Sequence, residues 1–326
     1  MMKHSFARYR QTASLGVLVL ALVACSMQQD SSPHPIILKA RGGEQVFTTP
    51  ELAVDALVDA NRRDDKAMLL KILGTNAADI ISSGDPVADK EGHAKFIAAY
   101  DTAHHLEDGD KNSKILVIGQ EDWSLPIPLV PTTPNEWQFD TEAGKEEILN
   151  RRIGRNELSA IATCRAYVEA QRDYASKFHA PNGKPEYAQR FISRPGKHDG
   201  LYWPVKAGAE ESPFGPLIAN AQIDDTEHDN GHYKHEPHHG YYYKILKQQG
   251  SSPVGSAKDY VVNRHMTEGF ALLVFPAKYG DSGVMTFIVD QNGIVFERNL
   301  GAETATLAPQ ITQFNPDENW RVVTDQ

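Results

Sequence analysis

Five histidines fall within twelve residues of the chain and could form a metal site. They are His228, His232, His235, His238 and His239. Imidazole nitrogens bind zinc and copper, and Asp225, Glu227 or Asp229 could complete such a site. A metal bound here would support a metal-assisted hydrolase of the periplasm.

The same stretch also fits a solvated loop. Asn230-Gly231 and Pro237 interrupt any helix that would place the histidines on one face. Metal ligands need further hydrogen bonds that fix their geometry, and an acidic loop offers no obvious source of them. We therefore predict no native metal and no cofactor. The first four histidines should lie in an exposed loop, and His239 should lie where a strand begins.

Two further stretches contain side chains that could bind or react. Tyr202 and Trp203 lie beside a turn in DGLYWP, where they could form a platform for a sugar or a peptide, or fill a core. Gly280-Asp281-Ser282-Gly283 looks like the surroundings of a serine nucleophile, but it falls between two expected strands and predicts a turn. The sequence contains no G-x-S-x-G, P-loop or C-x-x-C motif. His235-Glu236-Pro237-His238-His239 has the letters of H-E-x-x-H, but that zinc motif needs a helix, which Pro237 interrupts. These observations favour a protein that is not an enzyme, and they identify no catalytic residue.

The amino terminus has the pattern of an export signal. Residues 1–24 combine a basic start with an apolar run that is shorter than the roughly 20 residues of a membrane-spanning helix. The run ends in Leu22-Val23-Ala24-Cys25, which resembles the lipobox of bacterial lipoproteins. That resemblance implies lipidation of Cys25 and cleavage before it, and Ser26 then favours the outer membrane. We expect a lipid-anchored protein that faces the periplasm; a plain secreted protein is the alternative.

The net charge of the chain argues against one class of partner. The net charge is −10, and the expected leader holds three basic residues and no acidic one, so the mature chain would be more acidic still. Such a charge argues against nucleic acid as a partner. We expect contact with the membrane through the lipid anchor, and with an envelope protein or the cell wall.

Cys164 is the one other cysteine, and its place on an apolar stripe predicts a buried thiol.

After a flexible tether at 25–46, residues 47–141 are expected to form an N-terminal α+β domain. Thr48 or Thr49 can cap a helix that begins at Pro50. Further helices are expected at 65–73 and 90–105, and β-rich stretches at 114–120, 123–130 and 136–141. Helices followed by a sheet resemble the NTF2-like cone fold.

Residues 142–326 are expected to form a long helix packed on an antiparallel sheet. The helical pattern covers 145–178. Its apolar face holds Leu158, Ile161, Cys164, Val168, Gln171 and Tyr174, and its polar face holds Glu157, Arg165, Glu169 and Arg172. The expected strands are 241–249, 269–277, 283–290 and 293–299, with a two- or four-residue loop at Asn292-Gly293. The order of elements over 145–301 is similar to the globular heads of type IV pilin-like proteins, although the charged internal helix does not suit a filament.

Several motifs resemble one family in the same order. They are RRIGRNELSAI at 151–161, DGLYWP at 199–204, SPFGPL at 212–217, HGYYYKIL at 239–246 and the segment 269–301. The chain is identified from them as a member of the bacterial envelope proteins catalogued as domain of unknown function 2950, from Phe47 to Trp320. The resemblance implies an exported protein and carries over no catalytic residue. The chain departs from the family at Arg264-His265, where a turn containing glycine is expected.

Overall fold

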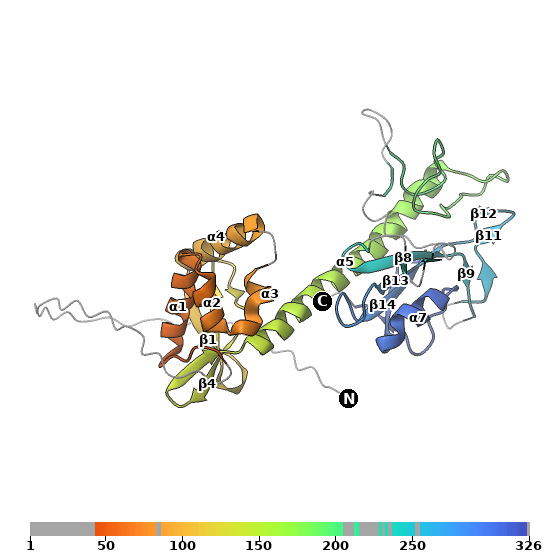
Figure 1. Cartoon of the computed structure of the whole chain (residues 1–326). Helices are drawn as coiled ribbons and strands as arrows, with labels where there is room; N and C mark the ends of the chain where they lie inside the picture. Colours follow the sequence, from red (N-terminus) through yellow and green to blue (C-terminus); the bar gives the residue numbers. More distant parts are fainter. Residues whose placement is uncertain are drawn as a thin grey trace, which may run out of the picture. The chain divides into compact units, whose positions relative to one another are not determined.

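The computed structural model describes residues 43–82, 86–204, 212–214, 228–229, 232–233, 237–251 and 255–324. Cys25, the leader and most of the expected tether lie outside the described residues, and so does His235. The fold is α+β, as predicted, with helices and antiparallel sheets (Figure 1). In the described part of the chain, no helix is both long and apolar enough to cross a membrane.

The first hydrophobic cluster lies between Phe47 and Phe139. Its helical elements are α1 (Pro50–Arg62), α2 (Lys66–Leu73), η1 (Thr75–Ala77), α3 (Ala78–Ile81) and α4 (Pro86–Thr102). Its strands are β1 (His104–Asp108), β2 (Lys114–Ile118), β3 (Trp123–Ser124), β4 (Leu129–Thr133) and β5 (Glu136–Phe139), with η2 (Asp110–Asn112) between β1 and β2. They pair in the order β1-β2-β4-β5, and β3 pairs with β2.

The start of α1 follows the sequence prediction, whereas the end of α4 does not. Thr49 Oγ1 accepts a hydrogen bond from Leu52 N at 3.3 Å, and Pro50 is the first helical residue. The helix expected to reach residue 105 ends at Thr102. His104 and His105 instead pair with β2, and the sheet hydrogen bonds take the place of a further helical turn.

Helix α5 (Thr141–Lys177) starts beside residues of the first hydrophobic cluster, and its later turns belong to the second cluster. Asp140 caps it, because the side chain accepts a hydrogen bond from Ala143 N at 3.0 Å. At its start, Thr141 Oγ1 donates to Leu73 O of α2 at 2.6 Å. Its later turns pack on the second sheet through buried residues such as Val168. The expected domain boundary before residue 142 stays a prediction.

The predicted faces of α5 are correct for its second half and wrong near its middle. Cys164, Val168, Gln171 and Tyr174 are buried, and Arg165, Glu169 and Arg172 are exposed, as predicted. Leu158 was expected to be buried, but its side chain is 69% exposed. Glu157 was expected on the outer face, but it accepts two backbone hydrogen bonds from residues 284 and 285. Because successive helical residues are about 100° apart, the contact of Glu157 with this segment turns Leu158 outward.

The second sheet is antiparallel, and its strands pair in the order β16-β15-β14-β13-β8. The strands are β8 (Tyr241–Leu246), β13 (Ala271–Pro276), β14 (Met285–Asp290), β15 (Val295–Asn299) and β16 (Arg321–Val322). The four strands expected from sequence are therefore present, with shorter bounds. The short pairs β6–β7 (His228–Asp229, His232–Tyr233), β9–β10 (Gln248–Gln249, Lys258–Asp259) and β11–β12 (Val261–Val262, His265–Met266) were not predicted.

The register of the β14–β15 hairpin differs from the expected one. Ile288 pairs with Phe296 and Val289 with Val295, so the five residues 290–294 separate the last pair of the hairpin, although Asp290 still belongs to β14 through its pairing with Ala271 of β13. The Asp290 carboxylate accepts hydrogen bonds from Asn292 N at 3.0 Å and from Asn292 Nδ2 at 2.7 Å, and these bonds fix the turn. An odd loop length reverses the faces, so Phe296 lies on the side of Ile288 rather than of Phe287.

Both faces of the second sheet are covered. Helix α5 packs on the face that contains Tyr243 and Phe287. The opposite face is covered by η3 (Gly301–Glu303), α7 (Thr304–Leu307), η4 (Ala308–Gln310) and the chain that follows them (Figure 1). Here Lys244 Nζ donates to Pro309 O at 2.8 Å, and the rings of Phe296 and Phe314 meet edge to face. This covering segment was not predicted from the sequence.

Candidate functional site

The structure describes the histidine-rich stretch in part. His228 and His232 were expected in a loop, but their backbones lie in β6 and β7, which pair with each other. His238 and Tyr241 exchange two backbone hydrogen bonds, of 3.0 and 3.1 Å, around a tight turn. Within this turn His239 has a φ of +47° and Gly240 a φ of +72°. Strand β8 begins at the next residue, which confirms that His239-Gly240 leads into a strand.

His238 was expected to be exposed, but it is half-buried, and its ring lies 4.3 Å from that of His239. Burial, followed by the charge of His239, lowers the pKa of His238, so its imidazole is neutral near pH 7. Among the described residues, no three His, Cys, Asp or Glu side chains are grouped so that they could hold a metal. His235 and the side chains of His228 and His232 lie outside that description.

Replacing His228, His232, His235 and His238 together with alanine tests the loop. We expect the free energy of unfolding to stay within about 1 kcal/mol of the parent value, as is usual for surface changes. The untagged parent should purify without stoichiometric metal, as measured by elemental analysis. Weak binding of added zinc would not count, because neutral imidazoles bind it without a built site. One tightly held metal per chain, lost in the quadruple variant, would contradict the loop interpretation.

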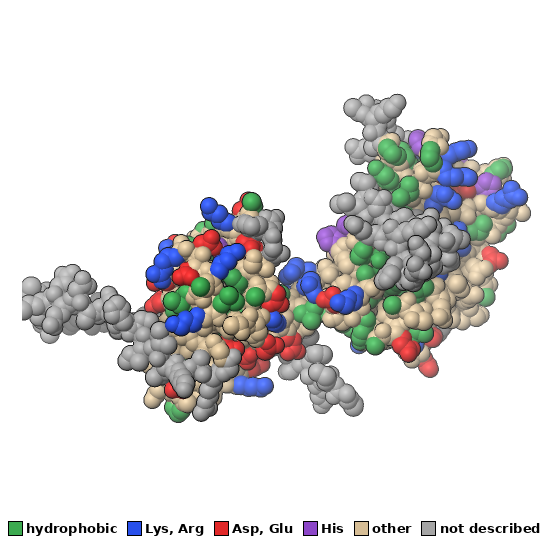
Figure 2. All heavy atoms as spheres, viewed as in Figure 1, with side chains coloured by type: hydrophobic (Ala, Val, Ile, Leu, Met, Phe, Trp, Pro, Cys, Tyr) green, Lys and Arg blue, Asp and Glu red, His purple; other side chains and the backbone are tan. Residues whose placement is uncertain are grey.

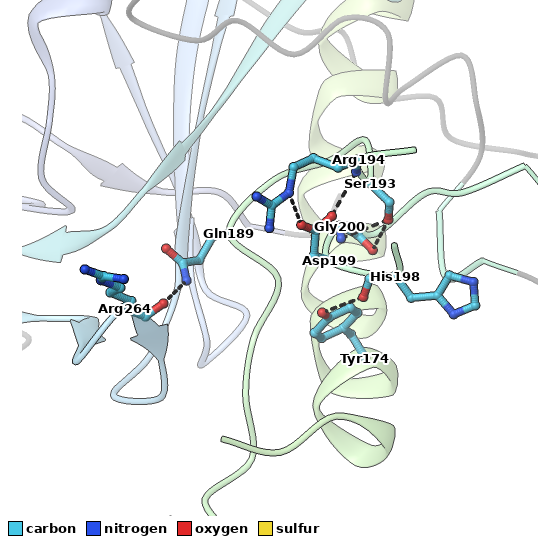
Figure 3. Close-up of polar contacts among 8 residues, drawn as sticks. All are labelled: Tyr174, Gln189, Ser193, Arg194, His198, Asp199, Gly200 and Arg264. Carbon is cyan, nitrogen blue, oxygen red and sulfur yellow. Dashed lines mark hydrogen bonds and ion pairs between the residues drawn. The ribbon is translucent and has the colours of Figure 1, made fainter. Parts of the chain in front are cut away.

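A hydrogen-bonded turn precedes the two aromatic residues that were considered as a ligand platform (Figure 3). Asp199 accepts hydrogen bonds from the backbone N and from Nε of Arg194. Ser193 Oγ accepts from Gly200 N at 3.0 Å, and Tyr174 Oη donates to His198 O at 2.9 Å. Burial acts to raise the pKa of Asp199, but the hydrogen bonds and charge of Arg194 outweigh it and lower that pKa. The turn is therefore closed by a charged carboxylate.

The two aromatic residues that follow this turn differ in how far they are buried. Trp203 is 4% exposed, and its ring stacks on His198 with the centroids 4.3 Å apart. Tyr202 is half-buried and packs against the second hydrophobic cluster. Trp203 thus fills the core and is not part of a ligand platform. Of the two residues, only Tyr202 has exposed surface that a ligand could contact.

Three of the sequence motifs meet where the middle of α5 lies beside the loop before β14. Glu157 Oε1 accepts hydrogen bonds from Val284 N and Met285 N, both at 2.9 Å. The residue before Glu157 on α5 is Asn156, and its Nδ2 donates to Ser282 O at 2.8 Å. Arg152 forms an ion pair with Asp281. We call this set the helix–loop clamp: Arg152, Asn156 and Glu157 with residues 281–285.

Two glycines allow the parts of the clamp to approach each other. A Cβ atom on Gly283 would lie 2.5 Å from Cζ of the buried Tyr241 and closer still to its oxygen. A Cβ atom on Gly240 would lie 2.7 Å from Cβ of Ser282. Burial, and then the charge of Glu157, raise the pKa of Tyr241, whose hydroxyl donates to Met285 O at 3.1 Å. The phenol is thus kept protonated.

The groups near the clamp that could react are engaged in structural contacts. Ser282 Oγ accepts from Lys278 N at 2.9 Å and donates to Lys278 O at 3.2 Å, as in a turn. No imidazole or carboxylate among the described residues is hydrogen-bonded to it. Cys164 is fully buried, and burial raises the pKa of its thiol. The clamp therefore positions the helix on the sheet, and the segment 280–283 is a turn, as predicted.

One comparison with known proteins gives a match. A family model described as "Protein of unknown function (DUF2950)" matches residues 44–323. The matched range includes both hydrophobic clusters, the helix–loop clamp and the turn before Trp203. No curated protein and no solved structure matches the chain. The NTF2-like and pilin-like resemblances therefore stay predictions.

Proposed function

Since the chain belongs to the DUF2950 family, whose description assigns no activity, we propose that it is a lipid-anchored, non-enzymatic binding component of the bacterial cell envelope. The observation that carries the proposal is Leu22-Val23-Ala24-Cys25 at the end of the apolar run. Each methylene of an acyl chain contributes about 0.8 kcal/mol when buried in a bilayer, and more than one chain gives a stable anchor. Ser26 favours the outer membrane, with the folded residues facing the periplasm.

The non-enzymatic part of the proposal is supported by the chemistry of the described groups. Ser282, Glu157 and Tyr241 are held by backbone hydrogen bonds, and the Cys164 thiol is buried. The net charge of −10 argues for a partner other than nucleic acid. Figure 2 shows both acidic and basic side chains on the viewed face, as suits contact with an envelope protein or the cell wall. A metal-assisted hydrolase would replace this proposal if the histidine variant lost a bound metal.

The substitution Cys25→Ser tests the anchor. Labelled palmitate should enter the parent protein and be absent from this variant, which should stay unprocessed or leave the membrane fraction. Cys164→Ala is the matched control, because it removes the one other cysteine and should keep the label. Palmitate that persists in Cys25→Ser would refute lipidation at this residue.

The partner itself can be sought in the same preparation. Chemical crosslinking in intact cells, followed by capture from detergent-solubilised envelope, should recover the partner with the parent protein. If recovery depends on Cys25, the anchor brings the two together; if it does not, the folded residues recognise the partner by themselves.

A further inference from the structure

A polar pocket of about 450 Å³ lies beside the β11–β12 hairpin. It is lined by Gln189, Lys247, Gln248, Asp259, Val261 and Arg264. Its volume falls in the range of sites for small molecules. It shares no residue with the helix–loop clamp or with the histidine-rich stretch, so it is a separate candidate.

The charged side chains of this pocket are not paired with one another. Lys247, Asp259 and Arg264 are exposed, and none of them forms an ion pair with another described residue. Nearby, by contrast, Lys184 and Glu268 do pair, at 2.6 Å. Two cations and one carboxylate around one cavity complement a ligand that has both a negative and a positive end. The amides of Gln189 and Gln248 add neutral hydrogen-bonding groups to the same lining.

Arg264 adopts a backbone conformation that would suit glycine better. Asn263 and Arg264 form the tight turn between β11 and β12, with φ angles of +52° and +72°. Such turns favour glycine at the second position, because a side chain there is strained. Gln189, which also lines the pocket, holds the turn by donating from Nε2 to Arg264 O at 2.7 Å (Figure 3). Strained backbone of this kind clusters at ligand-binding and other functional sites.

We propose that this pocket binds a small zwitterion, an amino acid or a dipeptide. The ligand carboxylate lies at Arg264 and Lys247, since a guanidinium can donate two parallel hydrogen bonds to a carboxylate. The ligand ammonium lies at Asp259, and Val261 contacts an apolar part of the ligand. This inference goes beyond the proposed function and does not depend on the lipid anchor.

Calorimetric titration of the full mature protein in detergent tests the inference. The probes are alanine and alanylalanine in the L and D forms, with N-acetylated and C-amidated alanylalanine as blocked versions. We expect saturable binding of at least one free form. Blocking either end should weaken it by about tenfold or more, because each end loses a charge-assisted hydrogen bond.

Two variants assign the ends of the ligand. Arg264→Gly relieves the backbone, so it should keep or raise the melting temperature while weakening the free dipeptide by about tenfold. It should leave the C-amidated dipeptide unaffected. Asp259→Asn should weaken the free dipeptide and leave the N-acetylated form unaffected. Lys278→Ala is the control, since this exposed lysine pairs with Asp281 outside the pocket and should not change binding.

The absence of saturable binding by any free form in the parent protein would overturn the inference. Equal affinity of the parent and of a stably folded Arg264→Gly variant would also overturn it. Neither result would bear on lipidation of Cys25, which is measured by the palmitate label.

Discussion

Gly283→Ala should lower the free energy of unfolding by about 2–3 kcal/mol, the upper part of the usual cost of overfilling a packed site. The new methyl group would meet the ring of Tyr241, which is fully buried. That ring cannot move aside freely, because its hydroxyl is bonded to Met285 O and it packs against Phe287. Denaturant unfolding followed by circular dichroism measures the change.

Gly154→Ala is the matched control for this prediction. Gly154 lies in α5, and a Cβ atom there would meet nothing within 4 Å. Alanine favours a helix over glycine by up to about 1 kcal/mol, so this variant should be more stable than the parent. Adding Tyr241→Phe to Gly283→Ala should recover part of the loss, since it removes the nearest atom. Equal unfolding midpoints for Gly283→Ala and Gly154→Ala would contradict the close approach.

Glu157→Ala should lower the free energy of unfolding by about 3 kcal/mol or more. The substitution leaves the backbone N–H groups of Val284 and Met285 without their acceptor in a partly buried place, and hydrogen bonds to a charged group are each worth about 1.5–3 kcal/mol. Glu157→Gln keeps an acceptor oxygen but loses the charge, so it should cost about 1 kcal/mol. The same denaturant measurement applies.

Glu169→Ala removes a carboxylate from the exposed face of the same helix. Glu169 pairs with Arg172 at 2.6 Å on the surface, and such pairs contribute no more than about 1 kcal/mol. The variant should therefore unfold close to the parent. If Glu169→Ala and Glu157→Ala cost the same, the helix–loop clamp would not stabilise the fold.

The features that sequence predicted correctly are those that depend on nearby residues. The cap of α1 needs only Thr49 and the three residues after it, and the buried face of α5 from Cys164 to Tyr174 follows from helical spacing. The strands of the second sheet were found because apolar, β-branched and aromatic residues cluster between turn residues. The tight turn at His239-Gly240 belongs to the same class, since glycine marks it directly.

The features that sequence missed depend on contacts between distant residues. The turn that places Phe296 beside Ile288 is set by hydrogen bonds to the Asp290 side chain, so its length could not be read from Asn292-Gly293 alone. Glu157 looked like a surface charge because its backbone donors lie far along the chain. The segment that covers the outer face of the second sheet has few strong patterns of its own.

The candidate site also combines features that depend on nearby residues with features that depend on distant contacts. A glycine between two strands suggests a turn, and only the folded structure reveals that Gly283 also makes room for the Tyr241 ring. The unpaired charges lie at three separate places, Lys247 between β8 and β9, Asp259 in β10 and Arg264 in a turn, so no short motif contains them. The expected departure from the family at Arg264-His265 is the sequence prediction that falls nearest to this pocket.

The burial of Cys164 gives the chain a built-in reporter of unfolding. With Cys25 blocked by lipid, Cys164 would be the one thiol of the mature protein. Its side chain lies between α5 and the second sheet and is 0% exposed to solvent. A thiol reagent can then reach sulfur only when that packing opens. The rate of labelling therefore measures how often the packing between α5 and the sheet opens in the native protein. The measurement works in detergent or in the membrane and needs no engineered probe.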